Sequence, residues 1–461
     1  MNDERPMKRA SFPALAVPVI AAAAVRLGFL ALVLLRSGTG ALYRADTLSY
    51  LLPGRNVLFH GSYSAAGLPE LVRTPGYSLF LAVVLLAGPI AVALAQIALS
   101  LLSVLLAGRI AFAVFGNRRA ALAGAWLFAF EPLSVIYSIQ LLSETLFLAL
   151  FLLFADRMTA FLLDQRLRTL ATAGLLLAAA TFVRPVTYYL PLALAVGLFI
   201  VLRHAPGLRW RAPAVLLLCV LPWLAAWQIR NKMETGYGGF SSIQPQDLYF
   251  FHTAEVTGRL QGRPMEDVLN ELGYNDERLF LARHPAAAHW NQAQRLEFMR
   301  SEASRILWAH PGLFLRAYCA GMLRVTFNPG SSVLFSLLDL PVDEATYHRE
   351  RFQGPLAAAL WALRNHPGQT AVMAAILLVL LTLYALALRG FILVVPKRHA
   401  SDPTLFLLLG LALYFLAVSG GAIGAARFRL PIMPILCIFA GAGLLRRESP
   451  ESPGTERDNV G

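Results

Sequence analysis

Long runs of apolar residues, separated by short clusters of charged residues, dominate this chain of 461 residues. Most of these runs approach the roughly 20 residues that a helix needs to cross the hydrocarbon core of a bilayer. We therefore expect about ten transmembrane helices. Their predicted ranges are 13–35, 90–115, 120–138, 143–162, 170–183, 186–202, 212–229, 370–395, 403–419 and 430–445.

The segment 37–88, between the first two runs, mixes charged residues with aromatic and Leu residues. This mixture is typical of a segment in the membrane interface, with one face in lipid and the other in a polar cavity. Pro and Gly mark the ends of elements, so we expect two short helices broken at Pro53-Gly54 and Pro75-Gly76.

A second polar segment, 231–310, contains no long apolar run. Residues 236–251 are expected to be extended or looped, whereas apolar spacings of three and four predict amphipathic helices at 265–272 and 289–310. Residues 311–330 are apolar but contain Arg316 and Arg324, which favours an interfacial helix over a span.

These patterns predict an all-α fold, a polytopic transmembrane helical bundle with interfacial helices and a small extracytoplasmic insertion. Four regions follow: an N-terminal transmembrane module (1–230) with its outer loop 37–88, the insertion with interfacial helices (231–369), C-terminal transmembrane helices (370–446), and a disordered cytoplasmic tail (447–461).

Composition agrees with a membrane protein, because 57% of the residues are hydrophobic, 15% are charged and the mean hydropathy is +0.58. The net charge of +13 lies mainly in short clusters between apolar runs, which the positive-inside rule explains. A nucleic-acid partner is therefore not expected. The three cysteines show no CxxC spacing and predict neither a disulfide framework nor a metal site.

The same Lys/Arg bias places both chain ends in the cytoplasm and predicts a multi-pass protein of the plasma (inner) membrane. The first apolar run has no convincing cleavage site and is interpreted as a retained helix. Charged residues then gather at the outer face of the membrane. They are Asp46, Arg73, Glu144, Arg184, Arg230, Arg427 and Arg429.

Charge at that depth usually faces a cavity or a charged partner. Each of these residues could also have a purely structural role. Arginines can reach lipid headgroups from the ends of spans. Glu144 suits the N-terminus of a helix, where the macrodipole favours a carboxylate. Asp46 begins DTLS and could cap the helix that follows it.

Several short motifs follow Asp46 along the chain. In order they are HGSYS, RTPGYSLFLAVV, LLSETLFLALFLLF, TFVRP, LPWLAAWQIRNKMETG, HPGLFLRAYCAGMLRVTFNPG and RFRLPIMPILCIFAG. This order, over about residues 10–445, resembles the polytopic glycosyltransferases of the GT-C type. The most similar groups are bacterial relatives of the protein O-mannosyltransferases and of the lipid A aminoarabinose transferases.

The resemblance implies an enzyme that moves a sugar, with inversion, from a polyprenyl-phosphate carrier to an acceptor on the non-cytoplasmic face. The acceptor can be lipid A, lipopolysaccharide core, another envelope glycan or a protein. The first-loop acid of the family falls on Asp46. Protein mannosyltransferases have an Asp-Glu pair there, whereas Thr47 follows here, which argues against a protein acceptor.

This chemistry needs a base for the acceptor hydroxyl, a role that we assign to Asp46. It also needs cations for the departing lipid phosphate, and the candidates are Arg427, Arg429, Arg184 and Arg73. Glu144 would orient a hydroxyl of the sugar or acceptor, or hold one of these arginines. The sequence contains no metal-ligand cluster, so neither a metal nor another cofactor is expected.

Two other functions remain open. A transporter or flippase for a lipid-linked or anionic solute would suit the apolar bundle, although such proteins often carry internal repeats and none is visible here. A ligase or polymerase of lipid-linked glycans would place its site in a late outer loop, where His252, Arg259 and Arg263 lie.

Overall fold

The computed structural model describes residues 13–340, 355–394 and 402–445. Its regular structure is almost entirely helical, and one short antiparallel hairpin pairs β1 (Ser64–Ala65) with β2 (Leu68–Pro69). The predicted all-α fold is therefore confirmed. The predicted cytoplasmic tail 447–461 lies outside the described residues, as do the basic residues before the first apolar run.

Within the described residues, five helices are long and apolar enough to cross a membrane. They are α1 (Ala16–Ser37, preceded by η1, Pro13–Leu15), α4 (Pro89–Phe115), α7 (Glu144–Asp164), α11 (Arg211–Thr235, preceded by α10, Pro206–Arg209) and α21 (Pro367–Val394). Five apolar helical segments are shorter. They comprise α3 (Pro75–Val84) with η3 (Leu85–Ala87), α8 (Leu167–Val183), η4 (Pro185–Thr187) with α9 (Leu190–Val201), α22 (Pro403–Val418) and α23 (Met433–Gly443).

The predicted span 120–138 is the exception, because the chain breaks there into α5 (Arg118–Ala129) and α6 (Pro132–Tyr137). A proline disfavours helical backbone at the residue before it, which here is Glu131. The Glu131 carboxylate then caps α6 by accepting hydrogen bonds from the backbone N–H groups of Leu133 (3.0 Å) and Ser134 (2.6 Å). The carboxylate thus satisfies donors that the new helix start leaves unpaired.

The first outer loop differs from prediction at Pro53-Gly54, which does not break the chain. Both residues lie inside α2 (Thr47–His60), which follows η2 (Thr39–Leu42). Gly54 is the point where α2 crosses α3, because a Cβ atom there would overlap the carbonyl oxygen of Ser78. The predicted boundary at Pro75 is confirmed, since Pro75 is the first residue of α3.

The insertion is more helical than expected. After an irregular stretch, α12 (Ile243–Gln246) leads into η5 (Asp247–His252), a turn of π-helix, where the sequence suggested a loop. The helices α13 (Thr253–Gln261), α14 (Met265–Glu271), α15 (Glu277–Arg283), η6 (Pro285–His289) and α16 (Gln292–Ala309) complete it. Both predicted amphipathic helices are present, and the insertion has its own apolar core around Tyr249 and Phe280.

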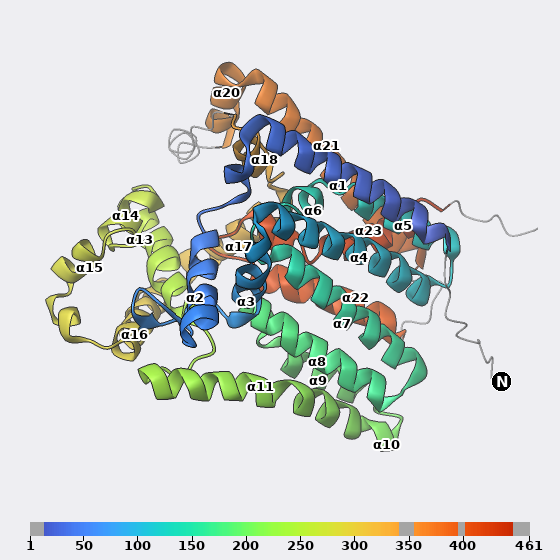
Figure 1. Cartoon of the computed structure of the whole chain (residues 1–461), viewed down its shortest axis with the longest axis horizontal. Helices are drawn as coiled ribbons and strands as arrows, with labels where there is room; N and C mark the ends of the chain where they lie inside the picture. Colours follow the sequence, from blue (N-terminus) through green and yellow to red (C-terminus); the bar gives the residue numbers. More distant parts are fainter. Residues whose placement is uncertain (1–12, 341–354, 395–401, 446–461) are drawn as a thin grey trace, which may run out of the picture.

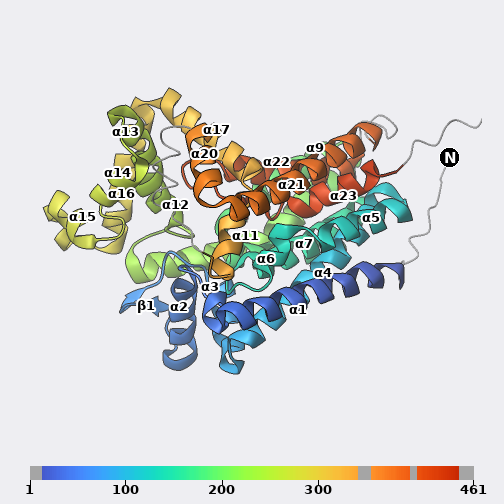
Figure 2. The ribbon, with the colours of Figure 1, turned by 90° about the horizontal axis from the view of Figure 1, so that it is seen from above.

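The remaining described helices are α17 (Pro311–Phe327), α18 (Ser331–Leu337), α20 (Pro355–Asn365) and the short η8 (Ala426–Arg429) before α23. In Figures 1 and 2 the long helices lie roughly side by side, and the first-loop helix α2 lies with α12–α16 at one end of them. The two polar segments of the sequence therefore meet at the same end of the bundle.

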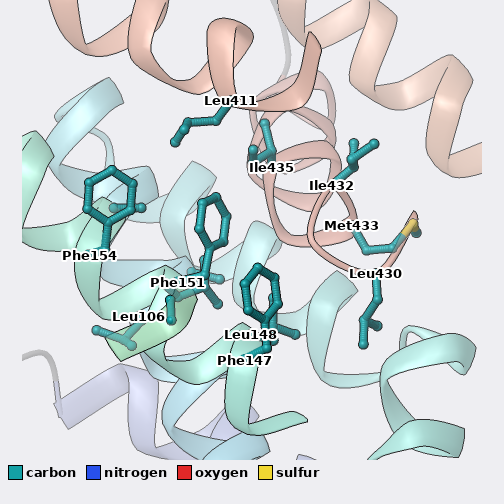
Figure 3. Close-up of a cluster of buried hydrophobic side chains, with 14 of the residues drawn as sticks. Leu106, Phe147, Leu148, Phe151, Phe154, Leu411, Leu430, Ile432, Met433 and Ile435 are labelled. Carbon is teal, nitrogen blue, oxygen red and sulfur yellow. The ribbon is translucent and has the colours of Figure 1, made fainter. Parts of the chain in front are cut away.

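Helix α7 is at the centre of the main core, and its apolar run is buried on several faces (Figure 3). The rings of Phe151 and Phe415 meet edge to face with their centroids 4.9 Å apart. Lipid is as apolar as these side chains, so close packing rather than the hydrophobic effect holds such helices together. The buried cluster packs α7 against α4, α8 and α22, and so fixes Glu144 at its N-terminus.

Candidate active site

Asp46 occupies the turn between η2 and α2, at the start of the first outer loop. Its side chain does not cap α2, so the capping alternative does not describe it. The next residue, Thr47, is buried, and its hydroxyl accepts from the Arg44 N–H (2.8 Å) and donates to the Leu141 carbonyl (3.0 Å). These bonds hold the turn against the segment that precedes α7.

The Asp46 carboxylate forms two ion pairs, one through each oxygen. Oδ1 lies 2.9 Å from Nη2 of Arg73, and Oδ2 lies 2.9 Å from Nη1 of Arg427. Asp46 and Arg427 are 381 positions apart in the sequence. The structure thus brings an acid from the start of the chain and guanidinium groups from the first loop and from near the chain's end into one site.

Arg73 is held on several sides. Its Nε donates to Ser49 (2.9 Å), its Nη1 donates to the Tyr50 hydroxyl (3.1 Å), and the guanidinium lies over the Tyr50 ring. The Glu70 carboxylate accepts from the backbone N–H of Arg73 (2.9 Å), while Arg230 donates to the Glu70 carbonyl (3.0 Å). Arg230, predicted at the outer face, therefore anchors the first loop to α11.

A third ion pair joins Glu144 to Arg184 at 2.6 Å, and Glu144 is buried. Ser143 lies between the two ion-paired groups, because its hydroxyl is 3.4 Å from Arg184 Nη1 and 3.1 Å from the Tyr50 hydroxyl. Tyr50 in turn accepts from Arg73. A continuous polar network therefore runs from Asp46 through Arg73, Tyr50 and Ser143 to the Glu144–Arg184 pair.

Arg429 points elsewhere. It is buried, and its Nη1 donates to the carbonyls of Val325 (2.5 Å), Thr326 (2.9 Å) and Asn328 (3.0 Å), at the C-terminal end of α17. Those carbonyls belong to the end of a helix that leaves its last acceptors without helical donors. In a 3₁₀-helix such as η8, residues two apart point roughly 120° from each other, which separates Arg427 from Arg429.

The charges of the cluster shape its acid–base properties. Burial by itself would raise the pKa of Asp46, but Arg73 and Arg427 outweigh it and hold that pKa below its ordinary value. The pKa of Arg427 is raised, since Glu144 and Asp46 outweigh the opposite effect of burial. Asp46, Arg73 and Arg427 therefore all stay charged in the absence of substrate.

Sequence reasoning missed one acid near this cluster. Asp247 is the first residue of η5 and is half-buried, and burial raises its pKa to about 7, although Arg73 and Arg427 lower it in part. A single acid in QPQDLYFF, in a stretch interpreted as a loop, has no spacing that would single it out. Only the folded insertion brings it within electrostatic reach of the two arginines.

In contrast, each of the three residues considered for a late-loop site contacts a different partner. His252 is stacked on Tyr318, with ring centroids 6.3 Å apart. Arg259 pairs with Glu255 at 2.6 Å, one helical turn away. Arg263 pairs with Glu271 on the surface of the insertion.

In its fold the chain resembles solved oligosaccharyltransferase structures. One is the archaeal oligosaccharyltransferase AglB from Archaeoglobus fulgidus in complex with an inhibitory peptide and a dolichol-phosphate (13% identity, TM-score 0.46). Another is the oligosaccharyltransferase of that organism tethered to an acceptor peptide (13% identity, TM-score 0.44). The matches cover 93% of this chain but only 49% and 48% of those chains, so it spans about half their length.

A third similar structure is ArnT from Cupriavidus metallidurans in the apo state (13% identity, TM-score 0.35), covering 90% of this chain and 76% of that one. No family model matches the sequence, and no curated protein matches it significantly. At this identity and these TM-scores, the similarities establish no activity by themselves.

The arrangement can perform specific chemistry. Fixed guanidinium groups stabilise an anion that develops beside them, and a half-buried carboxylate can accept a proton. Across the ranges that the structure describes, no group of three or more His, Cys, Asp or Glu side chains is arranged to hold a metal ion.

Proposed function

We propose that this chain is a membrane glycosyltransferase that moves a sugar from a polyprenyl-phosphate carrier to an envelope acceptor on the non-cytoplasmic face. The observation that carries the proposal is the pair of guanidinium groups, Arg73 and Arg427, held 2.9 Å from the two oxygens of Asp46. The motif order along the chain gives independent support from the sequence.

The phosphate of the donor lipid is the ligand that this cluster suits best. Arg427 is about one third exposed and Arg73 is less exposed, so each can donate to phosphate oxygens from within a partly water-excluded site. As the sugar leaves, negative charge grows on the phosphate oxygen, and fixed cations lower the energy of that transition state. Arg184 extends the cationic surface beyond Ser143.

Glu144 holds Arg184 in this proposal, and its burial leaves it little room to bind substrate directly. Arg429 is left out of the proposed phosphate site, because its Nη1 donates to the carbonyls at the end of α17 and its guanidinium forms no ion pair with Asp46. The assignment of Asp46 as the catalytic base stays a prediction, and its two ion pairs make this carboxylate a weak base.

The proposed setting is the inner membrane, with the site facing the periplasm or exterior. The acceptor is lipid A, lipopolysaccharide core, another envelope glycan or a protein.

Comparing envelope glycolipids from cells with and without the protein by mass spectrometry would identify the product. The expected result is the loss of one sugar from one glycolipid class.

Two substitutions test the proposal directly. Arg427→Ala should weaken binding of undecaprenyl phosphate, measured by native mass spectrometry, and slow turnover by roughly 10²–10³-fold. Asp46→Asn should abolish turnover while a polyprenyl-phosphate sugar still binds. Arg263→Ala is the matched control, because its ion pair with Glu271 lies on the surface.

Two outcomes would contradict the proposal. If Arg427→Ala leaves both binding and turnover intact, the phosphate assignment is wrong. If Asp46→Asn continues to move a lipid-linked solute across vesicle membranes, the protein is a transporter instead.

A further inference from the structure

Asp247 is an acid of this region to which the proposed mechanism gives no role. It is half-buried, and within the described residues its carboxylate makes no hydrogen bond or ion pair. Asp46, in contrast, is bound by a guanidinium on each oxygen. One carboxylate of the region is therefore engaged and the other is available.

Hydrogen bonds from the insertion hold Asp247 close to the first loop. The backbone N–H of Ser242 donates to the Leu71 carbonyl (2.8 Å), and the Ser241 hydroxyl donates to the Val72 carbonyl (2.8 Å). The next residue of that loop is Arg73. A single helical turn, α12, then leads from Ser242 to Asp247. The hydrogen bonds of Ser241 and Ser242 therefore hold the start of this turn against the loop segment that continues into Arg73.

The charges acting on Asp247 come from Arg73, in the first loop, and Arg427, in η8. Among the described residues, neither guanidinium forms an ion pair with the Asp247 carboxylate, because both pair with Asp46 instead. Tyr274, which follows α14, packs against the rings of Phe250 and Phe251, with centroids 5.4 and 4.8 Å apart. Burial raises the pKa of Tyr274, and Asp46 and Asp247 add to this effect. Tyr274 is therefore a neutral hydroxyl that can take part in orienting an acceptor.

The two carboxylates differ as bases. A general base works best when its pKa lies near the working pH. Asp46, whose pKa is lowered by two cations, holds a proton weakly. Asp247 has a pKa of about 7. An anionic phosphate bound between the arginines would offset their positive charge, raise the pKa of Asp247 and so make Asp247 a stronger base.

We propose that Asp247, in place of Asp46, is the general base of the sugar transfer, and that Asp46 is a positioning residue that holds Arg73 and Arg427 against the leaving phosphate. This inference rests on the proposed function. The acceptor oxygen forms a bond to the anomeric carbon while the bond from that carbon to the phosphate oxygen breaks. The hydroxyl proton passes to Asp247, and the electron pair leaves on the polyprenyl phosphate.

The test uses detergent-solubilised membranes that contain the full-length protein with the cell's own lipid-linked sugars and acceptors. Mass spectrometry measures the free polyprenyl phosphate formed, between about pH 5 and about pH 9. The wild-type rate should rise with pH and level off above about 7. Asp247→Asn should be slower by roughly 10²–10⁴-fold and lose that rise, whereas Asp247→Glu should keep it.

Undecaprenyl phosphate is the probe for donor-lipid binding, which Asp247→Asn should not weaken. Asp267→Asn is the matched control, because Asp267 lies exposed on α14 of the same insertion. A purely structural role for Asp247 would lower the rate at every pH and leave the shape of the pH profile unchanged.

A second readout needs no substrate. A carboxyl whose pKa is raised by folding destabilises the fold as pH rises from its unfolded pKa to its folded pKa. The melting temperature of Asp247→Asn should therefore exceed that of the wild type by a few degrees at about pH 8.5, and the difference should shrink towards about pH 5.

The inference is overturned if Asp247→Asn retains the wild-type rate and pH profile, or if the melting difference does not depend on pH. Loss of turnover in Arg427→Ala together with an unaffected Asp247→Asn would overturn this inference alone. If neither variant changes the formation of polyprenyl phosphate, the proposed function itself fails.

Discussion

At the scale of single residues, the direction of each arginine side chain decides what it does. Arg427 and Arg429 are two positions apart, yet one pairs with Asp46 and the other binds the carbonyls at the end of α17. Arg429 therefore joins η8 to α17, and through that contact it positions the turn that carries Arg427.

Replacing Arg429 should affect stability first. Arg429→Ala leaves the carbonyls of Val325 and Asn328 without this donor, and each unsatisfied buried group costs about 1–3 kcal/mol. We expect a clear drop in the midpoint of thermal unfolding, measured by scanning fluorimetry in detergent. Arg263→Ala, at an exposed ion pair, should shift it little. An unchanged midpoint for Arg429→Ala would show that this anchor contributes nothing.

At the scale of elements, the crossing of α2 on α3 sets the distance between the two sides of the polar cluster. Helix α2 carries Ser49 and Tyr50, which bind Arg73. Arg73 itself lies just before α3, which starts at Pro75. Gly54 permits the close approach of these two helices, because any side chain there would meet the backbone at Ser78.

The substitution Gly54→Ala should push α2 away from α3. Overpacking of this kind typically costs about 1–3 kcal/mol, and it should also slow turnover by moving Tyr50 away from Arg73. Thermal unfolding and polyprenyl phosphate formation measure the two effects. Gly28→Ala in α1 is the matched control, since nothing lies within 4 Å of a Cβ atom there. Equal behaviour of the two variants would refute the role given to the α2–α3 contact.

At the scale of the whole molecule, both polar segments gather at one end of the helical bundle (Figures 1 and 2). Helix α7 runs from Glu144, next to the polar cluster, to Asp164, near the predicted inner turn. The positive-inside rule predicts the direction of the bundle across the bilayer, with this end on the outside.

Cysteine labelling tests this orientation. Ser62→Cys in the first loop should react with a membrane-impermeant thiol reagent in intact cells, and Arg166→Cys should react only after permeabilisation. Both positions are exposed. The background would have Cys219, Cys319 and Cys437 replaced by Ala, because Cys319 is exposed. The opposite labelling pattern would place the polar cluster in the cytoplasm and exclude an extracytoplasmic acceptor.

The sequence by itself determined which parts of the chain form apolar helices, because the length and composition of a span are local properties. Nine of the ten predicted spans correspond to helices of the bundle or its shorter apolar segments. Lys/Arg bias and motif order also pointed to Asp46, Arg73, Arg184 and Arg427, which the fold brings into ion pairs and a shared polar network.

Tertiary structure alone decided the rest. Whether Arg427 or Arg429 reaches Asp46 depends on the path of a short 3₁₀ turn, and apolar periodicity does not encode that path. Asp247 comes near the cluster only through hydrogen bonds between the insertion and the carbonyls of Leu71 and Val72. Every residue offers those same backbone groups, so no side-chain pattern could have indicated which ones would pair.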